Sequence, residues 1–108
     1  MFARTVSIQL KPNSSALLTK QIENETIPML RKQAGFQGAL TLLASGGTEV
    51  VATSLWDNKE SAEAYAKTGY PEVLKNLNKF VEGIPKVQTY EVANSTFQKI
   101  AATVAARS

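Results

Sequence analysis

Apolar and polar residues alternate at the start of the chain, over residues 2–11. A period of two is typical of a β-strand that buries one of its faces. Pro12 cannot donate a hydrogen bond to a neighbouring strand, so we expect the strand to end before it. The predicted core face consists of Phe2, Arg4, Val6, Ile8 and Leu10.

Residues 15–34 change to the spacing of an amphipathic helix. Pro28 lacks a backbone N–H, so we predict a kink or break in this helix near Thr26 and Ile27. Gly35 is expected to end the helix in a left-handed conformation. The predicted inward positions are Leu17, Leu18, Ile22, Met29, Leu30 and Ala34.

A β-hairpin is predicted next, with strands over residues 36–44 and 48–56. Gly46 and Gly47 supply the positive φ angles that a tight turn requires. We expect one face of the hairpin to carry Phe36, Leu40, Leu42, Val50, Ala52, Ser54 and Trp56. We expect the other face to carry Ala39, Thr41, Leu43, Val51, Thr53 and Leu55. Both faces are therefore largely apolar.

A second helical region follows the hairpin. Asp57, with Glu60 three residues later, fits a capping box, so we predict that a helix begins at Asp57. The sequence Gly69-Tyr70-Pro71 is expected to interrupt this helix and restart it, because proline is favourable in a first helical turn. The predicted inward positions are Ala62, Tyr65, Ala66, Val73, Leu74, Leu77, Phe80 and Val81.

The restarted helix is expected to end at Gly83 and to be followed by a strand over residues 84–93. Residues 95–108 carry a weak helical pattern and are expected to form a short helix or a frayed tail. We therefore predict a single domain over residues 1–94.

The predicted order of elements is β-α-β-β-α-β, which is typical of an α+β, ferredoxin-like fold with a four-stranded antiparallel sheet. Helices in this fold cover one face of the sheet, and the other face of an antiparallel sheet is usually polar. Because both faces of the predicted hairpin are apolar, we expect a second copy of the chain to cover the free face. The sequence thus predicts a homodimeric α/β barrel.

Composition narrows the function classes. The twelve basic residues are scattered among nine acidic ones, so the net charge of +3 does not indicate a nucleic-acid-binding surface. No apolar run approaches the length of about 20 residues that a membrane span needs, and we expect a cytoplasmic protein. Neither Cys nor His occurs, which excludes from this chain a thiolate ligand, a Ser-His-Asp triad and a histidine-bound metal. We expect no metal and no cofactor.

Two short motifs lie where helices and strands meet. One runs from Pro28 through Ala34 and the sequence Gly35-Phe36-Gln37-Gly38; the other is Ser54-Leu55-Trp56-Asp57. With these motifs and its order of elements, the chain resembles the antibiotic biosynthesis monooxygenase family of the dimeric α/β-barrel superfamily over roughly residues 2–94. The resemblance implies an oxygenase that needs no cofactor, acts on aromatic polyketides or quinols, and holds them between the helices and the sheet.

One branch of that family degrades haem, using a Trp together with an Asn on the first strand and a His on the second helical region. The Trp matches Trp56. The Asn position falls near Val6, with Ser7 beside it, and the His has no counterpart in this chain. Haem degradation is therefore disfavoured.

The sequence offers candidates for a ligand pocket but no catalytic residue. Trp56 could form a pocket wall for a planar ligand, although a core aromatic residue is the commoner use of such a ring. Tyr65 and Tyr70 could donate hydrogen bonds to a ligand, or could be half-buried residues at helix ends. Arg4 could pair with a carboxylate of a partner subunit, which we favour, or bind an anionic ligand. The pocket candidates are Val6, Ser7, Phe36, Trp56, Tyr65 and Tyr70.

Three hypotheses about function follow. The first is a cofactor-independent monooxygenase that acts on a small aromatic or quinol-type substrate. The second is a barrel of the same kind that binds a small hydrophobic or aromatic ligand without catalysis. The third is a structural dimer whose core is filled by side chains.

Overall fold

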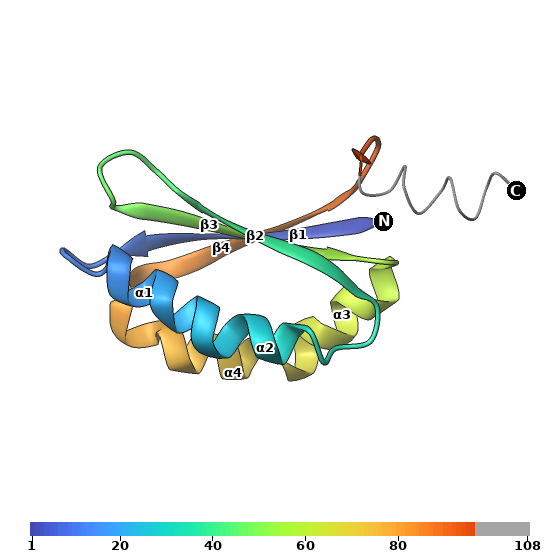
Figure 1. Cartoon of the computed structure of the whole chain (residues 1–108), viewed down its shortest axis with the longest axis horizontal. Coiled ribbons are helices and arrows are strands. Elements are labelled where there is room, and N and C mark those ends of the chain that lie inside the picture. The colour runs from blue at the N-terminus through green and yellow to red at the C-terminus, as the bar shows by residue number, and fades with distance from the viewer. Residues whose placement is uncertain (97–108) are drawn as a thin grey trace, which may run out of the picture.

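The computed structural model describes residues 1–96, and the predicted tail at 95–108 falls almost wholly outside this range. Four antiparallel strands form one sheet in the order β2-β3-β1-β4 (Figure 1). The strands are β1 (Phe2–Leu10), β2 (Phe36–Leu43), β3 (Glu49–Trp56) and β4 (Val81–Glu91). This is the predicted α+β, ferredoxin-like topology, with each helical region connecting two strands.

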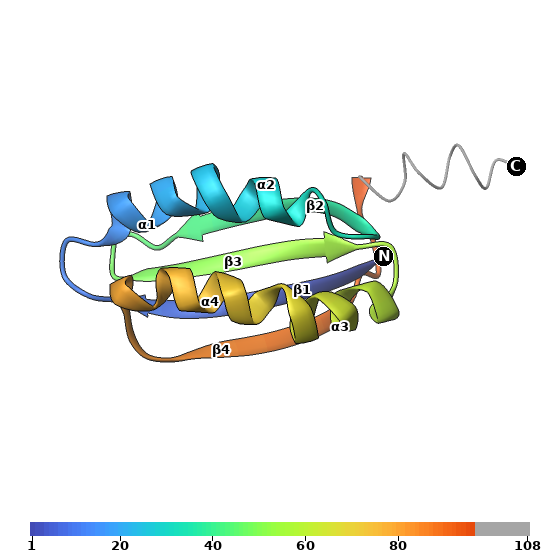
Figure 2. The same ribbon diagram turned by 90° about the horizontal axis from the view of Figure 1, so that it is seen from below.

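The helices lie on one face of the sheet, and the opposite face has no cover from the described residues (Figures 1 and 2). The first helical region runs alongside the second over the strands. Among the described residues, no helix is both long and apolar enough to cross a membrane. The helical segments are α1 (Ser15–Gln21), η1 (Ile22–Thr26), α2 (Ile27–Leu30), α3 (Lys59–Thr68), α4 (Tyr70–Leu77) and η2 (Asn78–Phe80).

Strand β1 lies in the interior of the sheet, between β3 and β4, and its alternation is confirmed. The residues that were expected to face the core are all buried: Phe2, Arg4, Val6, Ile8 and Leu10. Since these side chains point toward the helices, β1 contributes the largest single share of the core.

The predicted break near Pro28 is confirmed as a π-helical turn. In η1 the backbone N–H of Ile27 bonds to the carbonyl of Ile22, five residues earlier, before α-helical bonding resumes in α2. The prediction that the helix continues to Ala34 is wrong, because α2 ends at Leu30 and a turn leads to Gly35 (φ 81°). Leu17, predicted to face inward, is 60% exposed.

The predicted faces of β2 are wrong because of a β-bulge. The register shifts between Phe36 and Gly38, which adds one residue on β2 opposite β3. Directly opposed residues share a face, so from this point each β2 side chain lies on the face opposite to the predicted one. Leu43 pairs with Val50 on the helix-covered face, whereas Leu42 pairs with Val51 on the free face.

Two boundaries in the second half also differ from the prediction. The N-cap of α3 is Asn58 rather than Asp57, and its side-chain oxygen accepts a hydrogen bond from the backbone N–H of Ser61 at 2.8 Å. Val81 belongs to β4, where it pairs with Leu10, and is not part of the helix. The predicted restart after Gly69 is confirmed, with proline in the first turn of α4.

Candidate functional site

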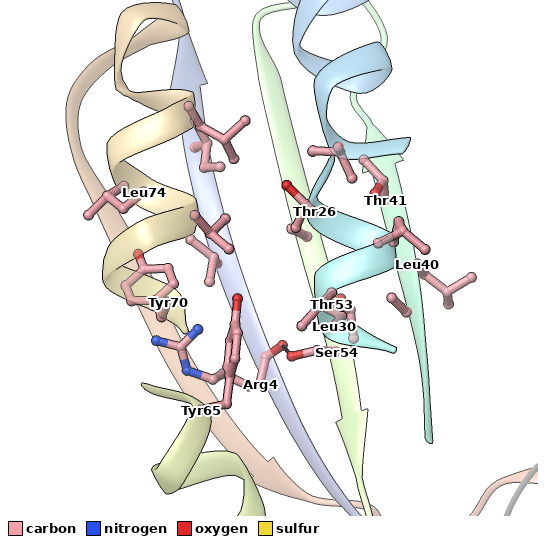
Figure 3. Close-up of a pocket in the computed structure, with 18 residues that line it drawn as sticks. Arg4, Thr26, Leu30, Leu40, Thr41, Thr53, Ser54, Tyr65, Tyr70 and Leu74 are labelled. Atoms are coloured by element: carbon pink, nitrogen blue, oxygen red, sulfur yellow. Dashed lines mark hydrogen bonds between the residues drawn. The ribbon is translucent and has the colours of Figure 1, made fainter. Parts of the chain in front are cut away.

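A narrow cavity lies between the helix-covered face of the sheet and the two helical regions (Figure 3). The space inside it that is open to a water-sized molecule is about 50 Å³, and the empty space reaches about 560 Å³ when the mouth that opens to solvent is included. Most of its surface is apolar, as in small-molecule sites, where a few polar groups fix the orientation of a ligand. The lining residues come from strands β1, β2 and β3 and from the helical segments η1, α2, α3 and α4. The apolar ones include Val6, Ile8, Ile22, Ile27, Leu30, Val73 and Leu77.

One end of the cavity is cationic. Arg4 is the one charged residue among the described residues that line the cavity, and it is only 5% exposed. Its position follows from the alternation of β1, because residue 4 shares the inner face with Phe2 and Val6. Arg4 therefore points away from the free face of the sheet, the face on which we expect a partner subunit.

Two tyrosines surround the guanidinium group of Arg4. Its central carbon lies 4.0 Å from the centroid of the Tyr70 ring and 5.5 Å from that of Tyr65. Figure 3 shows the guanidinium group close to the Tyr70 ring, with Tyr65 beside it. These distances are typical of cation–π contacts, which contribute about 2 kcal/mol or more when the cation is desolvated.

The buried charge of Arg4 has no counter-charge within the described chain. Residues 1–96 contain all nine acidic residues, and in this range the one ion pair joins Lys59 to Glu63 on the surface of α3. Burial lowers the pKa of Arg4, while the phenols of Tyr65 and Tyr70, the latter also through a hydrogen bond, act in the opposite direction. Since a guanidinium group does not lose its proton in proteins, Arg4 places a net positive charge in the cavity.

Tyr65 is held as a neutral hydrogen-bond donor. Burial raises the pKa of Tyr65 to about 12, against the opposing effect of the Arg4 charge, and Tyr70 adds to the rise. Its ring lies against Gly69, where an added Cβ would come within 2.7 Å of a Tyr65 ring carbon. Glycine at the junction of α3 and α4 therefore allows the ring to approach the backbone closely, and this approach helps to set the direction of its hydroxyl.

Trp56 supports the cavity from behind rather than forming its wall. The ring is fully buried and its Nε1–H donates a hydrogen bond to the Ser54 hydroxyl at 2.9 Å. It stacks on Tyr65, with ring centroids 5.0 Å apart, and meets the edge of Phe36 at 5.6 Å. Phe36, Trp56, Tyr65 and Tyr70 thus form a continuous row of aromatic rings that ends at Arg4.

The structure divides the six pocket candidates into three groups. Val6, Tyr65 and Tyr70 line the cavity. Phe36 and Trp56 lie behind it in the aromatic row. Ser7 lies on the free face of the sheet, opposite Val51 and Lys86, and so does not reach the cavity.

Arg4 is absent from the pocket residues predicted from the sequence, although the sequence carries a signal for it. Arg4 interrupts an otherwise apolar face of β1, and a charge in a core position is rare unless it is paired or functional. The sequence could not show that the groups around Arg4 would be phenols rather than carboxylates. Among the described residues, no group of three or more Asp and Glu side chains is arranged to hold a metal ion.

No protein-family model and no curated protein sequence matches this chain. Solved structures do match it. A monooxygenase from Streptomyces coelicolor, in complex with nanaomycin D, aligns with a TM-score of 0.75 at 19% identity over 87% of this chain and 88% of its own. A proposed antibiotic biosynthesis monooxygenase from Deinococcus radiodurans aligns with a TM-score of 0.67 at 19% identity over 88% and 95%. A protein of unknown function from Nitrosomonas europaea aligns with a TM-score of 0.74 at 14% identity over 88% and 91%. At these identities, the comparison shows a shared fold.

Proposed function

We propose that this protein belongs to the antibiotic biosynthesis monooxygenases and oxygenates a small aromatic or quinol-type substrate without a cofactor. The observation that carries the proposal is the cavity between helices and sheet, which is apolar along its length and cationic and phenolic at one end. A monooxygenase of the same fold, with nanaomycin D bound, supports the same class of ligand.

The chemistry makes few demands on the protein. An activated methylene group loses a proton to form a carbanion, which passes electrons to O₂; CH₂ and O₂ become C=O and H₂O, so one oxygen atom enters the substrate and the other leaves as water. Binding in an apolar cavity desolvates the carbanion and holds it near O₂. Since no Asp, Glu, Lys or His side chain lines the described cavity, we assign proton removal to water or hydroxide.

Oxygen consumption tests this proposal. Hydroquinones and anthrones should be consumed together with O₂ faster than in controls without protein. An Ala52→Phe variant, which fills the cavity, should lose this activity, while Ala64→Phe, at an exposed position of α3, should retain it. Equal rates with the two variants would show that the cavity is not the site.

A second candidate is a barrel that binds the same ligands without reaction. The specific observation in its favour is that the indole N–H of Trp56 is already bonded to Ser54, so that Trp56 offers no hydrogen-bonding group to a substrate. Binding of the compounds, without O₂ consumption above the control, would select this candidate. The cavity beside Val6 and Tyr65 counts against the third hypothesis, a structural dimer with a filled core.

We further propose that two chains associate through the free faces of their sheets. Leu40, Leu42 and Tyr90 are each about half exposed on this face (51%, 52% and 50%). Leu42 pairs with Val51 at the β2 edge of this face, while Tyr90 lies opposite Ala3 at the β4 edge. An exposed apolar area that crosses a whole sheet favours an interface, and a symmetric dimer would cover the area on both chains.

A further inference from the structure

We propose that the ligand of this cavity is a mainly apolar molecule with one anionic oxygen group, which Arg4 binds. The inference rests on the proposed function in one respect, that the cavity holds a small ligand. It goes further by stating which chemical group the ligand must carry and where that group lies.

The first step is the cost of burying Arg4. Arg4 is only 5% exposed, and removing an ion from water costs several kcal/mol unless the ion is paired. The contacts with Tyr65 and Tyr70 are attractive, but each ring is neutral, so these contacts leave the charge uncompensated. Because the described residues supply no counter-charge, an anion that enters the cavity would stabilise the Arg4 guanidinium group further.

The second step is access. Arg4 lines the cavity, so that an anion entering from the mouth can reach the guanidinium group without passing through the core. The rings of Tyr65 and Tyr70 lie beside it, and the Tyr65 hydroxyl can donate a hydrogen bond to the same oxygen group (Figure 3). A guanidinium group with a phenol hydroxyl beside it matches a carboxylate, or an ionised hydroxyl of an enol or phenol.

The third step is the rest of the ligand. Beyond the cationic end, the cavity walls are aliphatic side chains and threonines, including Ile22, Leu30 and Val73. These walls contain no second cation among the described residues, so a second anionic group would be buried without a partner. The cavity therefore selects a monoanion over a dianion and over a neutral molecule of the same shape.

Isothermal titration calorimetry with three naphthalene derivatives tests the inference. 2-Naphthoate carries a carboxylate, 2-naphthamide is its neutral analogue, and 2-naphthol is measured at a pH below and a pH above the ionisation of its hydroxyl. We expect the wild-type protein to bind at least one anion about 10- to 100-fold more tightly than the amide, which is the effect of a charge-assisted hydrogen bond. Preference for naphthoate alone assigns a carboxylate, and preference for ionised naphthol alone assigns an enolate or phenolate.

Variants of Arg4 test whether this residue causes the preference for the anion. Arg4→Gln should abolish the preference for the anion and leave the affinity for the amide nearly unchanged, while Arg4→Lys should retain part of the preference. Arg31→Gln removes the same charge from an exposed position and should behave as wild type. The comparison of anion and amide on the wild-type protein stands even if Arg4→Gln does not fold.

Two results would overturn the inference, and only the second of them would also overturn the proposed function. If the wild-type protein binds the amide as tightly as both anions, the cavity holds ligands but Arg4 does not select them. If the protein binds none of the three compounds, the proposed ligand-binding function fails together with the inference.

Discussion

The indole ring of Trp56 and the phenol ring of Tyr65 are stacked, with centroids 5.0 Å apart and planes inclined by 27°. Trp56 is fully buried, whereas Tyr65 lines the cavity and lies against the cation of Arg4. The tryptophan at the end of β3 therefore acts on the cavity through the tyrosine on α3. It positions a group that can meet a ligand, and has no exposed surface with which to meet one itself.

Replacing Trp56 should therefore affect stability more than ligand binding. Trp56→Ala removes a fully buried ring and should destabilise the protein by about 3–5 kcal/mol. Trp56→Phe retains a stacking partner for Tyr65 and should cost less, with the affinity for 2-naphthoate changed little. Urea unfolding followed by circular dichroism measures the first effect, because the chain has no other tryptophan to report by fluorescence.

The exposed Leu17 provides a control, since Leu17→Ala should change stability by less than about 0.5 kcal/mol. A Trp56→Phe variant of wild-type stability that has lost its affinity would contradict this account. It would mean that the indole ring contacts the ligand directly.

Gly69→Ala should be destabilising, although alanine is intrinsically the better helix former by about 1 kcal/mol. An added Cβ would lie 2.7 and 2.8 Å from two carbons of the Tyr65 ring, which is itself fixed by Trp56. We expect a net loss of about 1–3 kcal/mol in the free energy of unfolding, as for other overpacked sites. Gly38→Ala is the matched control, because no atom lies within 4 Å of its added Cβ. Greater stability of Gly69→Ala would show that the Tyr65 ring can move away.

Arg4→Met should leave the ligand-free protein as stable as the wild type, or more stable by about 1–2 kcal/mol. Methionine retains the apolar length of the side chain and removes a buried charge that has no counter-charge among the described residues. Arg31→Met at an exposed position should change stability little. Thermal unfolding without ligand measures both variants. A loss of more than about 2 kcal/mol in Arg4→Met would instead identify the cation–π contacts as a structural clamp.

Tyr65 should make the protein less stable at alkaline pH. Its pKa is raised to about 12 in the folded protein, whereas an ordinary tyrosine ionises near pH 10. Between these pH values the unfolded chain loses a proton that the folded protein retains, so the free energy of unfolding falls as pH rises. The loss over this window is on the order of 2 kcal/mol, and Tyr65 has no such effect below about pH 10.

Urea unfolding at a series of pH values tests this effect. The Tyr65→Phe variant should show a shallower decline above about pH 10 than the wild type, because phenylalanine has no proton to lose. Tyr90→Phe removes a phenol on the free face of the sheet, outside the cavity, and should leave the decline that is due to Tyr65 in place. Parallel declines for the wild type and Tyr65→Phe would mean that Tyr65 ionises normally.

The sequence predicts the fold well where periodicity is uninterrupted. On β1 a strict alternation gives the correct buried face, including Arg4. On β2 the extra residue between Phe36 and Gly38 moves the following side chains to the opposite face of the sheet, and the alternation of apolar residues does not predict this bulge. Val81 fits the apolar spacing of a helix and of a strand equally well, and its pairing with Leu10 decides for the strand.

The site is predictable only in part, because it depends on contacts between distant elements. Tyr65 and Tyr70 could be selected as residues beside a pocket, since both lie where the second helical region breaks at Gly69. That Arg4 meets these two rings depends on how α3 and α4 cross β1, which is a matter of tertiary packing. Of the two uses that the sequence allows for Trp56, the structure shows the commoner one, a core aromatic residue, because Tyr65 stacks on it and lines the cavity in its place.

Association through the free face of the sheet gives a final prediction. Light scattering at micromolar concentration should give the mass of two chains. Leu42→Glu should shift the protein to the mass of one chain, because a carboxylate would be buried against the partner's apolar face without a cation. Leu17→Glu introduces the same charge at an exposed leucine of α1, away from the sheet, and should remain dimeric. A wild-type mass of one chain would refute the dimer, and monomers from both variants would place the interface elsewhere.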